Sequence, residues 1–509
     1  MAELGEAPLV SMPRAAQLRR PGEEESTEWV DRFMKQILAR DYDASRETLR
    51  SAVARGASQR LAAQYGKVLE SFLSKRDELE NPVVLARFGA CILRQIDPET
   101  GRGLAVPGYV PGGTELWKQR PLMYIQSPSS RKSVQVCCAC LAPVGSLASQ
   151  LAHLRLPAPS GAEEVLLGSG VCVPCGEEGC GEVFCSRECR DWALRESSHA
   201  LLCAGRLPSA RLEALRALER FAEDRDQEHM LLLGHGVARM VLALREGEPL
   251  VEVLRRYTQQ FASKPWDALA EGGNGATDED TPESRKALLA EATAHLRALF
   301  EGEDLAAPLL EEELLSGLLG TFELVNMCIS LSHPLNERGE EIAGLLDAQT
   351  LARLAESQRS ADDDSSSEGT EAGGEAGGEE PGDAAEAEAG EENPEAAAVE
   401  AARKGTLFAN VLGTSLCEAL SFTNHSCLPN VRMDFATSSC PEASGPGLWV
   451  YCVARRPLIP GDEVLMAYVP SVVGKPLEVR QRRMKRFGFP CRCRSCLTDE
   501  MLAREGDTL

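Results

Sequence analysis

Long apolar runs and aromatic side chains are scarce in this chain of 509 residues. No apolar run reaches about 18 residues, the length that a membrane span needs, so no transmembrane helix is predicted. Aromatic residues make up only 5% of the chain, so leucine, valine and alanine must supply most of the core. The first residues show neither a basic start nor an apolar stretch, so we expect no secretory signal there and a reducing compartment for the chain.

Basic residues are absent from residues 362–400, which contain fifteen Asp and Glu and carry −15 of the net −24. The rest of the chain is therefore only mildly acidic, and nothing predicts the basic surface that strong nucleic-acid binding requires. A basic protein partner is compatible with this balance. Residues 1–25 are polar, and 359–404 are too poor in large apolar side chains to offset their ordering entropy, so both are predicted to be disordered.

Cysteine is plentiful, with 18 residues, and most of them fall into clusters with the spacing of metal ligands. In a reducing compartment such clusters favour metal binding over disulfides. Cys491, Cys493 and Cys496 supply three thiolates where a tetrahedral structural site needs four. Cys427, which lies 64 residues upstream, can be the fourth. The earlier clusters comprise Cys137, Cys140, Cys172, Cys175, Cys180, Cys185, Cys189, His199 and Cys203.

Apolar periodicity divides the rest of the chain. Helical spacing runs from about 26 to 80 and dominates 205–357, whereas short apolar runs broken by Gly and Pro between 101 and 125 predict strands and turns. Strands are also predicted around 449–453 and 464–468, followed by a basic helix at 479–486.

Two motif groups carry a family resemblance. The run Cys185-x3-Cys189-x9-His199-x3-Cys203 resembles a MYND finger. Asn424-His425-Ser426-Cys427-Leu428-Pro429-Asn430, Tyr468 and the C-terminal Cys run occur in the order of a SET domain. The combination resembles the SET-and-MYND protein lysine methyltransferases, and Trp192 to Cys203 with Gly320 to Asn326 resembles their plant trithorax-related branch. The implied fold class is α+β, with a SET β-core split by a MYND zinc finger, a helical insertion and a zinc-closed C-terminal (post-SET) segment.

The resemblance implies three zinc ions. It pairs Cys137, Cys140, Cys185 and Cys189 on one metal and Cys175, Cys180, His199 and Cys203 on a second, with Cys427, Cys491, Cys493 and Cys496 on the third. The finger departs from the family in a long insertion at 141–171 and in a Cys-x4-Cys pair, so Cys172 remains an alternative to Cys175.

The resemblance also assigns a cofactor, S-adenosyl-L-methionine. Tyr468 is the implied catalytic tyrosine and also contacts the cofactor, while Phe489 stands where the family stacks the adenine ring. The other implied cofactor-binding residues are Gly101, Arg102, Gly103, Asn326, Asn424 and His425.

The implied domains are a disordered start (1–25), N-terminal helices (26–85), the N-terminal part of the SET domain (86–136), the finger (137–203), a helical insertion ending in a SET core segment (204–358), the acidic disordered linker (359–404), the SET catalytic core (405–490) and the post-SET zinc segment and tail (491–509).

The function predicted from these motifs is S-adenosylmethionine-dependent methylation of protein lysine, with histone as the leading substrate class, in the nucleus or cytoplasm. The resemblance adds a proline-rich peptide as a partner of the finger, and no membrane partner is expected. The rival interpretation is a non-catalytic scaffold that uses the finger and a retained SET core for interactions in transcriptional regulation. Cofactor binding discriminates between the two.

Overall fold

The computed structural model describes residues 42–57, 86–97, 100–259, 263–269, 280–355, 394–438 and 447–506, with residue 261 and single positions between 29 and 69. Within these residues the chain is a mixed α+β structure. It divides into two compact units, residues 1–112 with 457–463 and residues 113–456 with 464–509. The segments 1–25 and 359–393, predicted to be disordered, lie outside the described residues.

The first unit contains an antiparallel sheet of order β1-β2-β3, formed by Ala86–Phe88, Cys91–Asp97 and Gly101–Ala105. The β2–β3 turn is closed by the Asp97 carboxylate, which accepts from the backbone N–H and the hydroxyl of Thr100 at 2.6 and 2.7 Å. Gly101 follows at φ 81°, a left-handed conformation that glycine adopts without strain. The later segment 457–463 returns to this unit, where Val106 N–H donates to the Asp462 carbonyl at 3.0 Å.

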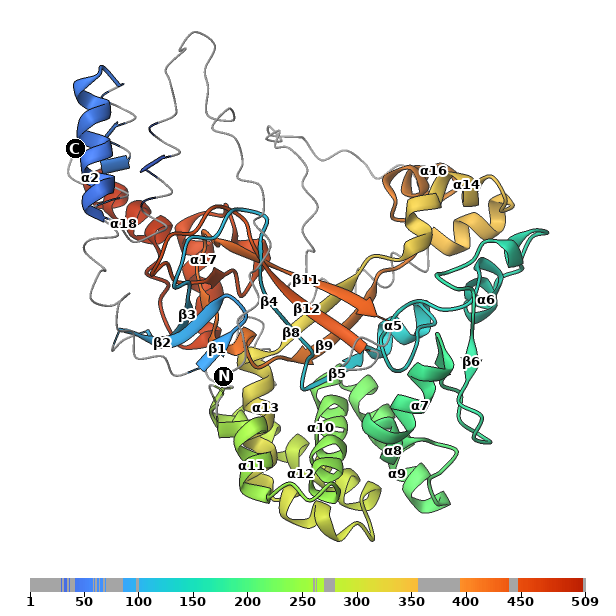
Figure 1. Ribbon diagram of the computed structural model, residues 1–509. Coiled ribbons are helices and arrows are strands. Elements are labelled where there is room, and N and C mark those ends of the chain that lie inside the picture. Colours follow the sequence, from blue (N-terminus) through green and yellow to red (C-terminus); the bar gives the residue numbers. More distant parts are fainter. Residues whose placement is uncertain are drawn as a thin grey trace, which may run out of the picture. The chain divides into compact units, whose positions relative to one another are not determined.

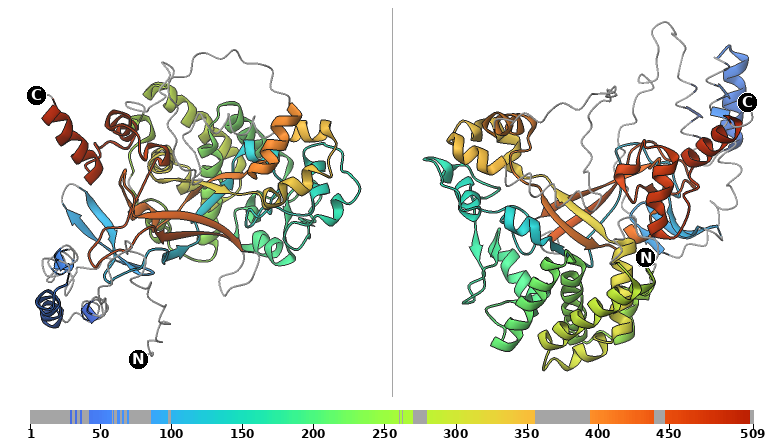
Figure 2. Two further views of the ribbon diagram at one scale, coloured as in Figure 1. Left: turned by 90° about the horizontal axis from the view of Figure 1, so that it is seen from above. Right: turned by 180° about the vertical axis from the view of Figure 1, so that it is seen from behind.

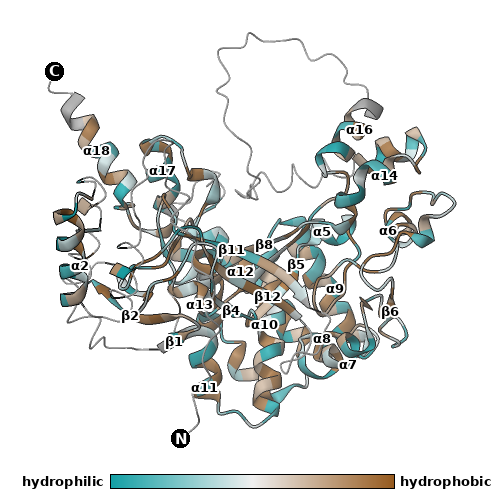
Figure 3. Ribbon diagram, turned by 45° about the horizontal axis from the view of Figure 1, so that its top comes forward, coloured by the Kyte–Doolittle hydropathy of each residue, from teal (hydrophilic) through white to brown (hydrophobic). Residues whose placement is uncertain are grey.

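Helix α2 (Tyr42–Ala54) also belongs to the first unit. Its buried residues Ser45, Thr48 and Ala52 recur at spacings of three and four, as expected for one face of a helix. Figure 3 shows this helix with hydrophilic and hydrophobic residues in alternation, consistent with the amphipathic pattern predicted for 26–80.

The second unit holds the longer strands. One antiparallel sheet has the order β11-β12-β4 and another β5-β9-β8, and β10 pairs with β13 in parallel. β11 and β12 pair over eight residues, from Val431 opposite Ala454 to Ser438 opposite Gly447, and form the long orange strands of Figure 2. The strands span Glu115–Gln119 (β4), Met123–Gln126 (β5), Met327–Leu331 (β8), Val411–Leu416 (β9), Asn424–His425 (β10), Val431–Ser438 (β11), Gly447–Ala454 (β12) and Leu465–Met466 (β13).

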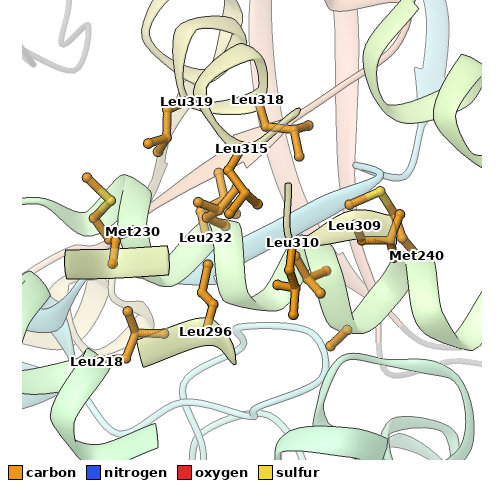
Figure 4. Close-up of a cluster of buried hydrophobic side chains, with 14 of the residues drawn as sticks. Leu218, Met230, Leu232, Met240, Leu296, Leu309, Leu310, Leu315, Leu318 and Leu319 are labelled. Carbon is orange, nitrogen blue, oxygen red and sulfur yellow. The ribbon is translucent and has the colours of Figure 1, made fainter. Parts of the chain in front are cut away.

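A helical bundle lies on one side of β5, β8 and β9 (Figure 1). It is formed by α9 (Ser209–Asp224), α10 (Glu228–Arg245), α11 (Leu250–Leu254), α12 (Pro282–Leu299) and α13 (Glu312–Val325). Leu315 and Leu318 of α13 and Leu232 of α10 are fully buried, and Leu315 lies beside Leu232 (Figure 4). A Cβ at Gly236 of α10 would lie 3.0 Å from the Met123 sulfur of β5, so glycine permits this close approach of helix and sheet.

The finger, residues 137–203, has a small core of its own around the fully buried Phe184. It contains β6 (Val173–Pro174), β7 (Val183–Phe184), α7 (Arg187–Glu196) and α8 (His199–Leu202). The Arg120 guanidinium, just after β4, lies 5.3 Å from the Trp192 ring of α7 and 5.2 Å from the Trp449 ring of β12. This cation–π contact on both sides joins the finger to the sheet.

The insertion within the finger has a packing role. Its helix α6 (Leu147–His153) buries Leu147 and Leu151 in a separate hydrophobic cluster together with residues of α14 (Gly339–Ala343) and α16 (Pro394–Lys404). In the two views of Figure 2 the helices α14 and α16 lie side by side. The insertion at 141–171 therefore contributes its helix α6 to this separate hydrophobic cluster.

Helix α16 corrects one prediction. Residues 394–404 were expected to continue the disordered linker, but they are helical. Ala398 and Ala402 are buried at 0% and 4% exposure, and a Cβ at Gly339 would lie 2.4 Å from the Ala402 carbonyl oxygen. Alanine has high helix propensity, and the absence of a Cβ at Gly339 permits the close approach to the Ala402 backbone, whereas composition alone made the segment look unable to pack.

Helices α17 (Leu477–Met484) and α18 (Arg494–Gly506) complete the second unit. Helix α17 overlaps the predicted basic helix, but Arg480 on it is buried rather than exposed. Among the described residues, no helix is long and apolar enough to cross a membrane.

Candidate metal centres and candidate active site

The first candidate metal centre lies in the finger. The structure brings together Cys137, Cys140, Cys185 and Cys189, whose sulfur atoms all lie within 4.8 Å of one another. Cys140 and Cys185 are 3.6 Å apart and Cys185 and Cys189 are 3.3 Å apart. Ser186 caps α7 by accepting the Cys189 N–H at 3.1 Å, which holds Cys189 at the start of the helix.

The second candidate centre contains Cys175, Cys180, His199 and Cys203. The Cys175 sulfur lies 3.4 Å from His199 Nε2 and 3.7 Å from the Cys203 sulfur. Burial lowers the pKa of His199 and so favours the neutral imidazole that binds metals. Cys172 is exposed and outside this group, so the structure brings Cys175 into the cluster and leaves the alternative out.

The third candidate centre joins distant parts of the second unit. The Cys427 sulfur lies 3.7 Å from those of Cys491 and Cys496, and Cys493 completes the group. A hydrogen bond with the Cys491 thiol lowers the pKa of Cys493 to about 3, which favours the thiolate form that a metal binds. The sequence predicted Cys427 as a member of this set although 64 residues separate it from Cys491, because the three C-terminal cysteines need a fourth ligand.

These donor sets fit zinc. Four sulfur ligands at a Zn–S distance of about 2.3 Å would stand about 3.8 Å apart at the corners of a tetrahedron. The sulfur separations of 3.3 to 3.7 Å in the three sets are close to that value. Thiolates with at most one imidazole form the soft donor set that structural zinc prefers.

Arg480 is a residue of the third centre that the sequence did not reveal. Its guanidinium is 2% exposed, lies 3.3 Å from the Cys496 sulfur, and donates to the Ser495 hydroxyl at 2.9 Å. It also forms an ion pair with Asp499 of α18. Four thiolates around a divalent ion leave an excess of two negative charges, so a buried cation beside them is electrostatically favourable.

The segment Asn424–Asn430 is held against the strand that precedes Tyr468. Asn424 and His425 pair with Leu465 and Met466 in parallel. Asn430 is buried; its N–H donates to the Leu465 carbonyl at 3.0 Å, and its side-chain oxygen accepts the Leu465 N–H at 2.8 Å. Asn430, the last residue of the motif, thus hydrogen-bonds both the N–H and the carbonyl of Leu465.

An aromatic cluster surrounds Tyr468. Its ring centroid lies 5.3 Å from that of His425, 5.0 Å from that of Phe487 and 6.4 Å from that of Phe489. The backbone N–H of Tyr468 donates to Nδ1 of His425 at 3.0 Å, and burial lowers the pKa of His425 to about 4. Phe489 is 37% exposed, so part of its ring is open to a ligand. Phe487 was not predicted, although a second Phe two residues before Phe489 was visible in the sequence.

Asn326 follows directly after α13, as the residue that caps it. Its side-chain amide donates to the Thr414 hydroxyl at 3.2 Å. Its buried Oδ1 has no hydrogen-bond partner among the described residues. A buried acceptor without a donor costs about 1–3 kcal/mol unless a ligand or water supplies one, so this atom fits a ligand that carries N–H or O–H groups.

The predicted cofactor residues fall into two groups. Asn424, His425, Tyr468 and Phe489 are brought together by the pairing and ring contacts above, and Asn326 belongs to the same unit. Gly101, Arg102 and Gly103 lie in β3 of the first unit.

Comparison with known proteins places these observations in a family context. No family model matches the chain. The chain is 26% identical over 344 residues to the histone-lysine N-methyltransferase ATXR2 of Arabidopsis thaliana, which covers 63% of this chain and 62% of that protein. It is 28% identical over 92 residues to a SET and MYND domain-containing protein of Dictyostelium discoideum, with 18% of this chain and 24% of the relative covered. It is 30% identical over 105 residues to the protein-lysine N-methyltransferase SMYD4 of Danio rerio, with 17% and 14% covered.

The chain thus spans less than two thirds of the length of each of these relatives. The similarities nevertheless confirm the resemblance drawn from the motifs. The chain is related to the SET-and-MYND domain proteins and to a plant trithorax-related lysine methyltransferase.

Proposed function

We propose that this protein is an S-adenosylmethionine-dependent protein-lysine N-methyltransferase, with histone as the leading substrate class and the nucleus, the cytoplasm or both as its place of action. The observation that carries the proposal is the cluster of His425, Tyr468, Phe487 and Phe489 beside the third cysteine cage. The names of two relatives, a histone-lysine and a protein-lysine methyltransferase, support the reaction class.

We propose that the α+β fold comprises a SET core split by the finger, with domain limits as expected from the motifs apart from the helix at 394–404. The three cages would each hold a zinc ion with a structural role, because each offers four protein ligands and leaves no open position for catalysis. A proline-rich peptide remains the proposed partner of the finger.

Bound S-adenosylmethionine would supply a methyl group on a sulfonium centre. Phe489, with part of its ring exposed, would offer an aromatic face to the adenine. Asn326 would use its unpartnered Oδ1 to accept from the amino group of the cofactor. Asn424 would contact the cofactor beside β10. The cofactor roles that the resemblance gives to Gly101, Arg102 and Gly103 of β3 stay predictions.

The protein residues have a positioning task. A lysine amine attacks only when neutral, and a wall of aromatic rings disfavours the ammonium ion by desolvation, which lowers the lysine pKa. The Tyr468 hydroxyl would orient the amine toward the methyl carbon, and most of the rate gain would come from alignment and the exclusion of water. Methyl transfer would form a carbon–nitrogen bond at the lysine amine as the carbon–sulfur bond of the sulfonium is lost, and the amine would release its extra proton to solvent.

The substitution Tyr468→Phe tests this proposal, because it keeps the ring and removes only the hydroxyl. Turnover should fall on the order of a hundredfold, the usual effect of losing one positioned donor, while cofactor affinity by calorimetry stays near wild type. Asn424→Ala should lower affinity and turnover together. Failure of the wild-type chain to bind S-adenosylmethionine would instead favour the rival function of a non-catalytic interaction scaffold.

A further inference from the structure

His425 stands between the third cysteine cage and Tyr468. Its Nε2 lies 3.3 Å from the sulfur of Cys427, and its Nδ1 lies 3.0 Å from the backbone nitrogen of Tyr468. The ring is 8% exposed, so water has little access to either nitrogen. One side chain therefore contacts both a candidate metal ligand and the backbone of the candidate catalytic residue.

The two contacts define where the imidazole proton lies. A backbone N–H only donates, so Nδ1 must accept and carries no proton. In the neutral ring the proton then resides on Nε2, which faces the Cys427 sulfur. A thiolate bound to a metal is a hydrogen-bond acceptor, and an N–H directed at it both satisfies the donor and disperses the charge of the cage.

We propose that His425 is a positioning residue that couples the third cage to the active site. Its Nε2–H donates to the Cys427 thiolate, which fixes the tautomer and the ring orientation, and its Nδ1 then holds the backbone N–H of Tyr468. The cage thus orients the tyrosine through a side chain, in addition to closing the C-terminal segment. The link to catalysis rests on the proposed function, whereas the two hydrogen bonds do not.

The neighbouring contacts show why such a link is useful. β10 and β13 are only two residues each, and the chain leaves the pairing after Met466, two residues before Tyr468. The Ser426 N–H donates to the Met466 carbonyl at 2.8 Å, and two residues later the Tyr468 N–H donates to the His425 ring at 3.0 Å. The hydrogen bond to the His425 ring therefore holds the backbone at Tyr468 in place beyond the end of the strand pairing.

Two carboxamide substitutions separate the two bonds. In His425→Asn the side-chain oxygen can occupy the place of Nδ1 and keep the Tyr468 bond, but nothing reaches Cys427. In His425→Gln the terminal NH2 can occupy the place of Nε2 and keep the Cys427 bond, but the acceptor for Tyr468 is lost. His295, a half-buried histidine in α12, provides matched Asn and Gln controls in the bundle.

The experiment uses the full-length zinc-loaded chain and two readouts that need no activity. The first is the rate at which N-ethylmaleimide alkylates each cysteine, followed by peptide mass spectrometry. The second is amide hydrogen exchange of the peptide that carries Tyr468. We expect His425→Asn to raise Cys427 alkylation on the order of fivefold with Tyr468 exchange nearly unchanged, because one hydrogen bond contributes about a factor of 2 to 12. His425→Gln should speed Tyr468 exchange by a similar factor and leave Cys427 protected.

Cys175 of the second cage serves as an internal control and should react equally in all variants. Equal changes of both readouts in both variants would reduce His425 to a packing residue and overturn the proposal, as would an unchanged Cys427 in His425→Asn. A methyl-transfer assay adds the functional arm, in which kcat should fall more in His425→Gln than in His425→Asn. If the wild-type chain transfers no methyl group, the proposed function fails while alkylation and exchange still decide the coupling.

Discussion

An ion pair between Arg285 of α12 and Glu323 of α13 lies close to the candidate cofactor contact Asn326, and its contribution to stability can be tested. Arg285 of α12, whose side chain is 8% exposed, contacts Asp280 and Glu323, each at 2.7 Å. Its guanidinium also lies 5.1 Å from the Trp266 ring, whose Nε1 donates to Glu323 at 3.0 Å. Glu323 is three residues before Asn326, so this network braces the end of α13 that presents the candidate cofactor contact.

The substitution Arg285→Met keeps the length of the side-chain stem and removes the charge. Breaking a fully buried pair costs about 3–5 kcal/mol, because the remaining charge is left uncompensated. Here the carboxylates of Asp280 and Glu323 are 30% and 25% exposed, so water solvates them in part. We therefore expect a loss of about 2–3 kcal/mol in the free energy of unfolding, which is below the range for fully buried pairs.

Urea unfolding followed by tryptophan fluorescence measures this loss, and calorimetry with S-adenosylmethionine measures its effect on the site. The matched control is Arg225→Met, because Arg225 pairs with Glu291 at 3.8 Å with both side chains about half exposed. That pair should contribute less than about 1 kcal/mol. If Arg285→Met costs no more than Arg225→Met, the network does not brace α13 and the argument is refuted.

Four further outcomes are expected. Elemental analysis of the purified chain should find three zinc ions, and Cys496→Ser should lower this to two and expose the C-terminal segment to protease. Arg480→Met should speed chelator-driven loss of one zinc on the order of tenfold, with an unchanged rate refuting its charge role. Deleting 362–392 should leave the midpoint of unfolding unchanged, whereas deleting 362–404 should lower it, because the second deletion also removes the buried alanines of α16. Burial lowers the pKa of His333 to about 3, whereas the unfolded state binds a proton below about pH 6.5. The free energy of unfolding should therefore fall as the pH is lowered. Between pH 7 and 5 it should fall by about 2 kcal/mol more in wild type than in His333→Phe.

The three cages illustrate what sequence can predict. Zinc ligands need fixed residue types at short spacings, so Cys137-x2-Cys140 and Cys185-x3-Cys189 were visible without any structure, and the structure brings each predicted set of four together. The strand at 449–453 was also predictable, because β-branched and aromatic residues are concentrated there. Of the strand predicted at 464–468, only Leu465–Met466 is formed. In these cases the local sequence contains the physical cause of the structure.

Other features depend on partners that the local sequence does not contain. Arg480 lies in a basic run that looks solvent-exposed, and only the fold places cysteine sulfurs beside its guanidinium. Helix α16 looked like linker by composition, because the helix that packs against it, α14, lies before the acidic segment in the chain. The roles assigned to Asn326, Asn424 and Tyr468 stay predictions.

The magnitudes explain why a metal cage stands so close to the candidate active site. β10 and β13 pair over two residues each, and each backbone hydrogen bond contributes only about 0.5–1.5 kcal/mol net. Closing the 64-residue loop between Cys427 and Cys491 costs several kcal/mol in chain entropy, so strand pairing alone leaves little surplus to order the segment that carries Tyr468. A structural zinc site contributes about 10–16 kcal/mol of binding free energy to folding. Metal binding at the third cage therefore dominates the local balance, and removing that zinc should disorder Tyr468 and Phe489 before the helical bundle unfolds.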